Sequence, residues 1–219
     1  MPYYNSRRFI GLIKGEQEFP AIDQMRVIAG KARRLNLMTI PGNNTRPTTD
    51  RVKETLFNIL QPELPGCRFL DLFAGSGAIG IEALSRGADS AVFVENNRRA
   101  AACIKENLRF TKLAGQATLV ESDVMTAIAR LERANQAFDI IFLDPPYQAG
   151  WEEKVLRALK TSCLADEGTW VVTEAELHED FSWAEEMGYS ITRIKEYKNN
   201  KHVFFQKAPL HKGDKEGNA

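Results

Sequence analysis

Residues 68–87 read RFLDLFAGSGAIGIEALSRG, and this stretch decides the fold. It begins with a short apolar run, passes through Gly75, Gly77 and Gly80 in G-x-G-x-x-G spacing, and ends in a helical pattern closed by Gly87. This spacing, after a strand and at the start of a helix, is typical of a loop for a nucleotide-like cofactor. The glycines permit a tight turn, and the helix N-terminus offers free N–H groups.

Carboxylates at successive strand ends help to distinguish two kinds of cofactor. Glu95 ends the second predicted strand, 20 residues after Gly75, where it can accept hydrogen bonds from ribose hydroxyls. Asp71 would oppose a pyrophosphate, but it suits the cationic amino-acid moiety of S-adenosylmethionine. Asp123 ends the third strand and is expected to meet an adenine amino group. A dinucleotide also fits the glycine loop, but the three carboxylates together favour S-adenosylmethionine.

Strands and helices alternate from Arg68 onward, which predicts an α/β domain. The apolar, Val/Ile/Leu/Phe-rich strands indicate a mainly parallel sheet covered on both faces, and the last two runs predict an antiparallel hairpin at its edge. The predicted strands are 68–74, 90–96, 116–123, 138–144 and 168–176, followed by a hairpin over 189–207. One predicted helix begins near Asp50, and four more span 77–87, 97–111, 124–134 and 152–163.

The fourth strand ends in LDPPY, residues 143–147. Asp144 is expected at the carboxyl edge of the sheet, where ligands bind in such folds. Pro145 and Pro146 fix the backbone and leave a stiff carbonyl acceptor beside the carboxylate, while Tyr147 offers a face on which an aromatic base can stack. Two hydrogen-bond acceptors and an aromatic ring together predict a binding site for a planar group that carries an exocyclic amine. A simple strand-to-loop turn is the alternative for the tetrapeptide taken alone.

Positive charge is concentrated near the N-terminus. Residues 1–60 hold ten Lys/Arg and five Asp/Glu, a net charge of +5, and residues 61–219 carry −5. Two β-like runs, 26–29 and 35–40, flank the basic turn GKARR and predict a hairpin that presents Lys31, Arg33 and Arg34. This charge fits either a polyanion-binding arm or a solvated face.

The chain is expected to divide into four parts. These are an irregular N-terminal extension over 1–24, a basic hairpin and helix over 25–60, a main domain over 61–208 and a disordered tail over 209–219. The three cysteines are scattered, without metal-ligand or redox spacing, which indicates a reducing cytoplasm and no metal. No apolar stretch is long enough for a membrane span. We expect a monomer.

Five segments together resemble the RsmD-type methyltransferases, which act on the N2 amine of a guanine in 16S ribosomal RNA. The segments are MRVIAGKARRLNL, TRPTTDRVKETLFNIL, LDLFAGSGAIGIEALSRGA, VFVENN and FDIIFLDPPY. The glycine loop and D-P-P-Y are common to many amine methyltransferases, whereas TRPTTDRVKETLFN is much more specific to this group. The resemblance covers about residues 25 to 207. The chain departs from the family in its first 24 residues, since members usually begin near Met25.

The resemblance implies a Rossmann-like, seven-stranded S-adenosylmethionine-dependent methyltransferase fold with a small N-terminal β-hairpin. It also implies a partner, which is 16S ribosomal RNA in the small subunit or its assembly intermediate. The implied cofactor-binding residues are Asp71, Phe73, Gly75, Ser76, Gly77, Glu95, Asn96 and Asp123. The implied catalytic residues are Asp144, Pro145, Pro146 and Tyr147, and the substrate-binding residues are Lys31, Arg33, Arg34, Arg46 and Thr48.

Three other functions share parts of this pattern. A DNA amine methyltransferase has both central motifs, but it generally needs a target-recognition domain larger than the segment before the first predicted core helix. A protein glutamine methyltransferase fits less well, because position 144 is Asp rather than Asn and the hairpin is basic. A non-catalytic RNA-binding assembly factor on the same fold is opposed by the intact D-P-P-Y.

Overall fold

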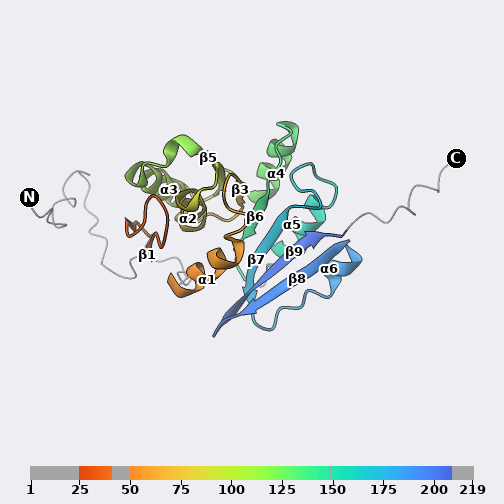
Figure 1. Ribbon diagram of the computed structural model, residues 1–219. Coiled ribbons are helices and arrows are strands. Elements are labelled where there is room, and N and C mark those ends of the chain that lie inside the picture. Colours follow the sequence, from red (N-terminus) through yellow and green to blue (C-terminus); the bar gives the residue numbers. More distant parts are fainter. Residues whose placement is uncertain (1–24, 41–49, 148, 209–219) are drawn as a thin grey trace, which may run out of the picture.

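The computed structural model describes residues 25–40, 50–147 and 149–208. Its centre is a seven-stranded sheet in the order β5-β4-β3-β6-β7-β9-β8 (Figure 1). The strands are β3 (Arg68–Asp71), β4 (Ser90–Val94), β5 (Ala117–Val120), β6 (Ile140–Leu143), β7 (Trp170–Glu176), β8 (Tyr189–Glu196) and β9 (Asn200–Lys207). The strands β3 to β7 pair in parallel, while β9 is antiparallel to both β7 and β8. The predicted α/β class and the antiparallel edge hairpin are confirmed.

Helices cover both faces of the sheet because alternate strand residues point to opposite sides. Phe69 and Phe142 belong to one buried cluster with side chains of α1, α2 and α3, whereas Leu70 and Ile141 belong to a second cluster with α4, α5 and α6. The helices are α1 (Asp50–Leu60), α2 (Ala78–Arg86), α3 (Arg98–Thr111), α4 (Val124–Arg133), α5 (Trp151–Leu159) and α6 (Trp183–Glu186). The short α6 and a 3-10 turn, η1 (Ala114–Gln116), were not predicted.

Parallel strands place the functional loops at one edge of the sheet. Each of β3 to β6 is followed by a helix that begins at the carboxyl edge and runs back toward the amino edge. For α2, the Gly87 carbonyl at its end accepts a hydrogen bond from Gly66, just before β3. The glycine loop therefore lies at the carboxyl edge, and the C-terminal end of α2 lies at the amino edge. None of the helices in the three described ranges is long and apolar enough to cross a membrane.

The N-terminal hairpin is shorter than the sequence predicts. Its strands, β1 (Met25–Arg26) and β2 (Asn36–Leu37), pair over two residues each. Beyond β1 the Val27 N–H still donates to the Leu35 carbonyl at 2.9 Å, but the N–H groups of Ile28 and Ala29 donate to the Glu82 carboxylate on α2, at 2.8 and 3.0 Å. The hairpin is thus attached to the helix that follows the glycine loop.

Buried charges hold the hairpin in place. Lys53 of α1 and Glu82 of α2 form a salt bridge of 3.4 Å with both side chains fully buried, and Lys53 also donates to the Arg26 carbonyl. Burial lowers the pKa of Lys53, and the Glu82 carboxylate opposes this shift. Removing one partner of such a pair leaves an uncompensated buried charge, at a cost of about 3 to 5 kcal/mol. Lys53, part of the segment most specific to the RsmD-type family, therefore has a structural role here.

Candidate active site

A cavity of about 560 Å³ opens at the carboxyl edge of the sheet, within the size range usual for a small-molecule site. It is formed by the ends of β3, β4, β5, β6 and β7 and by the start of α5. Its lining residues are Leu72, Phe73, Val94, Glu95, Asn96, Asn97, Ser122, Asp123, Val124, Asp144, Pro145, Pro146, Tyr147, Trp151 and Glu174. The cavity thus brings together Phe73, Glu95, Asn96, Asp123 and the D-P-P-Y residues of the predicted site.

Glu95 connects the glycine loop to the next strand end. One of its carboxylate oxygens accepts a hydrogen bond from the Gly75 N–H at 2.8 Å, and the other accepts from the Asn97 N–H at 2.7 Å. Gly75 and Gly77 have φ values of +55° and +81°, a left-handed conformation that favours glycine. Each carboxylate oxygen has two lone pairs, so Glu95 keeps acceptor capacity for ribose hydroxyls.

Asp71 lies buried beneath the glycine loop and does not line the cavity. Its Oδ2 accepts a hydrogen bond from the Gly80 N–H at 3.2 Å, while its Oδ1 has no partner within the described ranges. Burial raises the pKa of this carboxyl to about 7, and the Glu95 charge adds to the shift. An unsatisfied buried acceptor at this place fits a cationic ligand group reached directly or through water.

Asp123 lines the cavity at the end of β5 and also caps α4. Its side chain accepts a hydrogen bond from the Thr126 N–H at 3.0 Å, which lowers the pKa of the carboxyl. An ionised Asp123 with one oxygen engaged in the cap can still accept from an amino group. Phe73 and Trp151 also line the cavity, and their rings pack in a T-shaped arrangement with 5.9 Å between centroids. Sequence reasoning missed Trp151.

Ser76, Gly75 and Gly77 are not among the residues that line the cavity. The Ser76 carbonyl accepts a hydrogen bond from the Asn107 side chain at 2.9 Å, and the same side chain contacts the backbone of Met38. Asn107 therefore ties the glycine loop to the end of the N-terminal hairpin. Gly75 still contacts the cavity lining, because its N–H donates to Glu95.

The D-P-P-Y residues form the floor and the mouth of the cavity. Asp144 is partly accessible at the floor, Pro145 is buried, and Pro146 and Tyr147 are exposed, with 45% of Tyr147 accessible. Burial by the protein on its other sides raises the pKa of Asp144 well above its usual range, and the Glu174 charge raises it further. A ring at the mouth and a carboxylate below it are the groups that the predicted binding site for a planar amine requires.

Glu174 is a fourth carboxylate of the cavity, beside Glu95, Asp123 and Asp144, and sequence reasoning missed it. It lies on β7, is only 4% exposed, and accepts a hydrogen bond from the Tyr147 hydroxyl at 3.4 Å. The Asn200 side chain donates to it, and the His202 ring lies 3.3 Å away. The available signal was an acidic residue inside the predicted strand that reads WVVTEAE.

The basic turn of the N-terminal hairpin lies away from the cavity. Its backbone is fixed at the C-terminal end of α2, where the Lys31 N–H donates to the Ser85 carbonyl at 2.8 Å. Since α2 starts at the glycine loop and rises about 1.5 Å per residue, the turn is roughly 12 Å along the helix toward the amino edge. Lys31, Arg33 and Arg34 are exposed there. Arg46 and Thr48 fall outside the described residues.

The chain was compared with known proteins. The family model described as Conserved hypothetical protein 95 matches residues 25–206. The Bacillus subtilis protein named "Putative rRNA methyltransferase YlbH" is 37% identical over 181 residues, covering 80% of this chain and 98% of the relative. Ribosomal RNA small subunit methyltransferase D of Escherichia coli K12 is 41% identical over 155 residues, covering 70% of this chain and 76% of the relative.

A solved structure agrees with these sequence matches. The Escherichia coli structure named "Putative methyltransferase yhhF" is 34% identical, superposes with a TM-score of 0.73, and covers 85% of this chain and 99% of its own. The match includes the glycine loop, the carboxylates at the strand ends and the D-P-P-Y motif, since the family model spans all of them. The chain therefore belongs to the RsmD-type methyltransferase family and has its Rossmann-like, seven-stranded fold.

Proposed function

We propose that the protein transfers a methyl group from S-adenosylmethionine to the N2 amine of a guanine in 16S ribosomal RNA of the small subunit. The observation that carries the proposal is the position of Asp144 and Tyr147 on the same cavity as Glu95 and Asp123. A site for the amine thus adjoins a site for the methyl donor. Membership of the RsmD-type family supports the ribosomal substrate, because relatives carry the name Ribosomal RNA small subunit methyltransferase D.

Each of the proposed cofactor-binding residues suits a different part of S-adenosylmethionine. Glu95 would accept hydrogen bonds from ribose hydroxyls, Asp123 with Asn96 would meet the adenine, and the buried Asp71 would face the amino-acid moiety behind Phe73 and the glycine loop. S-adenosylmethionine, when bound, supplies a methyl group on a positively charged sulfur. The carboxylates of this cavity favour such a cation over a pyrophosphate, since like charges repel strongly in a site shielded from water.

The D-P-P-Y residues would make the exocyclic amine of the guanine a better nucleophile. An exocyclic amine is a poor nucleophile because its lone pair is delocalised into the ring. Hydrogen bonds from the NH2 group to Asp144 and to a carbonyl of the Pro145–Pro146 turn favour a nitrogen that is less conjugated. The Asp144 carboxylate then stabilises the positive charge that develops on that nitrogen, while Tyr147 holds the base in position.

The target guanine must leave its stack to reach this cavity, at a cost of a few kcal/mol that is lowest in unpaired RNA. The exposed basic residues Lys31, Arg33 and Arg34 would contact RNA away from the target nucleotide. Arg46 and Thr48, which lie outside the described residues, are expected to close over the cofactor or the substrate. We expect the protein to act as a monomer in the cytoplasm, without a metal ion.

The direct test uses small ribosomal subunits from cells that lack the modification. Purified protein should transfer labelled methyl groups from S-adenosylmethionine to these subunits, and mass spectrometry of the digested RNA should place the label on N2 of a single guanine. Asp144→Ala should abolish transfer with unchanged thermal stability, whereas Asp89→Ala, an exposed carboxylate at the amino edge, should retain it. Methylation of duplex DNA in place of ribosomal RNA would contradict the proposal. Binding without any methyl transfer would favour an assembly factor.

A further inference from the structure

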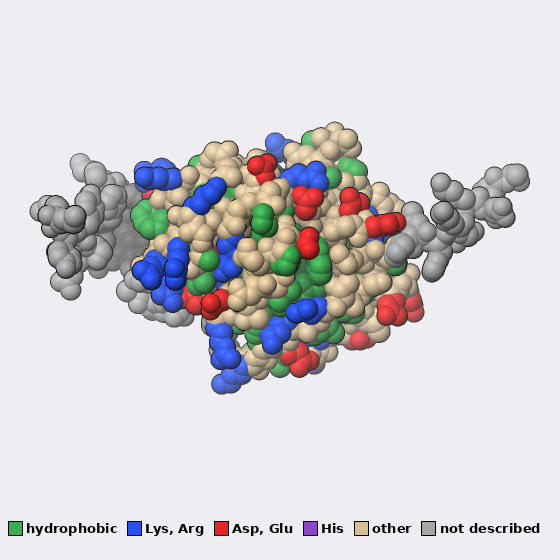
Figure 2. All heavy atoms as spheres, viewed as in Figure 1, with side chains coloured by type: hydrophobic (Ala, Val, Ile, Leu, Met, Phe, Trp, Pro, Cys, Tyr) green, Lys and Arg blue, Asp and Glu red, His purple; other side chains and the backbone are tan. Residues whose placement is uncertain are grey.

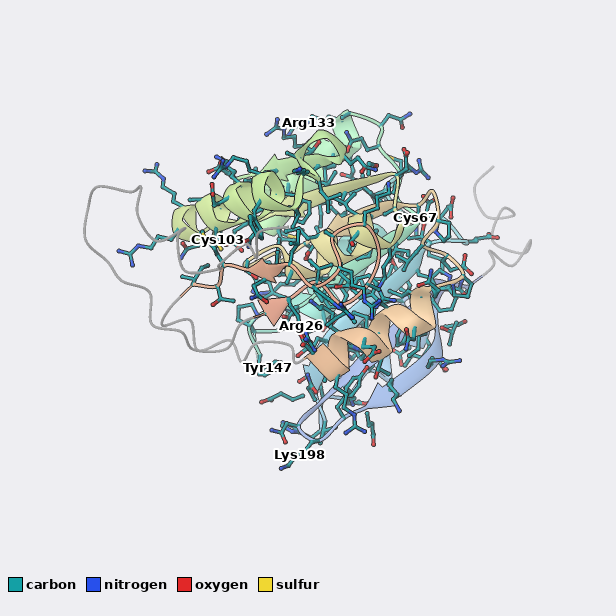
Figure 3. The ribbon with its side chains drawn as sticks, turned by 60° about the vertical axis from the view of Figure 1, so that its left-hand side comes forward. Arg26, Cys67, Cys103, Arg133, Tyr147 and Lys198 are labelled. Atoms are coloured by element: carbon teal, nitrogen blue, oxygen red, sulfur yellow. The ribbon has the colours of Figure 1, made fainter. Side chains whose placement is uncertain are left out.

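The turn between β8 and β9 lies at the same edge of the sheet as the cavity. The C-terminal end of β7 reaches the carboxyl edge beside β6, and antiparallel pairing sets Glu174 against His202 and Glu176 against Asn200. The turn formed by Tyr197–Asn200 therefore projects at this edge, where the Tyr197 N–H donates to the Asn200 carbonyl at 2.8 Å. Figure 3 shows Lys198 of this turn on the same side of the molecule as Tyr147, with Cys67 on the other side.

A shared carboxylate links this turn to the D-P-P-Y residues. Oε1 of Glu174 accepts hydrogen bonds from both the Tyr147 hydroxyl and the Asn200 side chain. Oε2 lies 3.3 Å from the buried His202 ring, whose other nitrogen is 3.1 Å from the Tyr197 hydroxyl. The turn and the ring at the cavity mouth are thus held by one buried group, so their relative position is fixed.

Positive charge faces the cavity side at this end of the hairpin. Lys195 is exposed and pairs in register with His202, which places it on the same face of the sheet as Glu174. Lys198 is exposed in the turn itself, and Figure 2 shows Lys and Arg side chains at the projecting end of the hairpin. The acidic Glu196 pairs with Lys201 and so faces the opposite side.

Resting on the proposed function, we propose that the β8–β9 turn is the RNA-contacting wall of the cavity mouth. Lys195 and Lys198 bind phosphates that flank the target guanine, and Glu174 keeps the turn in register with Tyr147. The more basic turn at Lys31 to Arg34 is fixed at the opposite end of α2 and cannot serve this purpose. An RNA backbone is the partner of matching chemistry, since lysines bind phosphate as flexible point charges.

The test compares charge reversal at two exposed lysines. Lys198→Glu changes the turn, and Lys160→Glu is its matched control after α5, at the amino edge. Association with small subunits would be measured at several salt concentrations, S-adenosylmethionine affinity by calorimetry, and methyl transfer by KM and kcat. We expect Lys198→Glu to weaken subunit binding and raise KM by about 10-fold, to reduce the salt dependence, and to leave kcat and cofactor affinity unchanged. Lys198→Arg should restore binding.

Three outcomes overturn the inference. The first is subunit binding by Lys198→Glu equal to that of Lys160→Glu. The second is an equal loss of cofactor affinity, which would mark the turn as structural. The third is an unmodified protein that does not bind ribosomal RNA at all, which would also overturn the proposed function. By contrast, an unmodified protein that binds in a Lys198-dependent way without methyl transfer would support the RNA surface and contradict only the activity.

Discussion

The Tyr147 hydroxyl donates a hydrogen bond to Glu174 across 3.4 Å, and this contact joins the D-P-P-Y loop to a strand that carries no recognised motif. Tyr147 is exposed at the cavity mouth, whereas Glu174 is almost fully buried. The buried partner therefore limits the orientations of an exposed ring. A fixed ring loses less conformational freedom when a base stacks on it, which is an advantage for binding.

Two substitutions at Tyr147 should separate stacking from hydrogen bonding. Tyr147→Ala removes the ring and should reduce kcat/KM for methyl transfer by about 5- to 150-fold, since base stacking contributes about 1 to 3 kcal/mol. Tyr147→Phe keeps the ring and loses one long hydrogen bond to the Glu174 carboxylate, so a decrease of roughly 3- to 10-fold is expected. S-adenosylmethionine affinity should be the same for both variants. Equal effects of Ala and Phe would mean that the hydroxyl, and not the ring, is needed.

The raised pKa of Asp144 predicts an acid limb in the pH dependence of methyl transfer. The carboxylate must be ionised to stabilise positive charge on the amine, so the rate should fall as the pH decreases through this raised pKa. Burial is the main cause of the shift and Glu174 is the second. Glu174→Gln removes that neighbouring negative charge and should move the acid limb to lower pH. Single-turnover rates measured over the acid and neutral range would show the displacement.

Glu153→Gln is the matched control for this pH profile. Glu153 is an exposed residue of α5 that pairs with Arg157 at 2.7 Å and does not line the cavity. Its replacement should leave the acid limb unchanged. An acid limb that stays in place in Glu174→Gln as well would show that Asp144 does not respond to the Glu174 charge.

Asp71 should make the cofactor-free protein less stable as the pH rises. Its pKa is about 7 in the folded state against 3.8 for an ordinary Asp, so the unfolded state ionises first. The free energy of unfolding should therefore decrease between about pH 4 and pH 7, by on the order of 4 kcal/mol, and level off above that range. Asp71→Asn should remove this decrease in urea unfolding experiments and weaken S-adenosylmethionine binding. If the free energy of unfolding of Asp71→Asn kept the same pH dependence as the unmodified protein, the decrease would not come from Asp71.

The sequence was sufficient for the elements that depend on local patterns. Five apolar runs that alternate with helical patterns predicted the parallel strands of the sheet. The last two runs, joined by turn residues, predicted the antiparallel hairpin that completes its seven strands. The carboxylates Glu95, Asp123 and Asp144 could be placed together because parallel strands end at one edge. These predictions need only the order of the elements and the direction of each strand.

The sequence was insufficient where distant segments share one group. The Glu174 carboxylate in the cavity is held by contacts with Asn200 and His202, and these contacts exist only because β9 pairs with β7. The basic turn is placed at the amino edge by contacts with Glu82 and Ser85, more than fifty residues away in the chain. No local pattern reports such contacts, because they depend on tertiary packing.

Gly30 gives the clearest test of how the hairpin is attached to α2. It has a φ of +81°, and a Cβ built at this position would lie 1.8 Å from the Ser85 carbonyl oxygen. Gly30→Ala combines left-handed strain with a backbone clash, so the free energy of unfolding should fall by about 2 to 4 kcal/mol. Gly115→Ala is the control, because a Cβ there meets nothing within 4 Å, and it should change stability by about 0.5 kcal/mol or less. Urea unfolding of both variants would measure the difference, and a neutral Gly30→Ala would show that the turn does not pack against the end of α2.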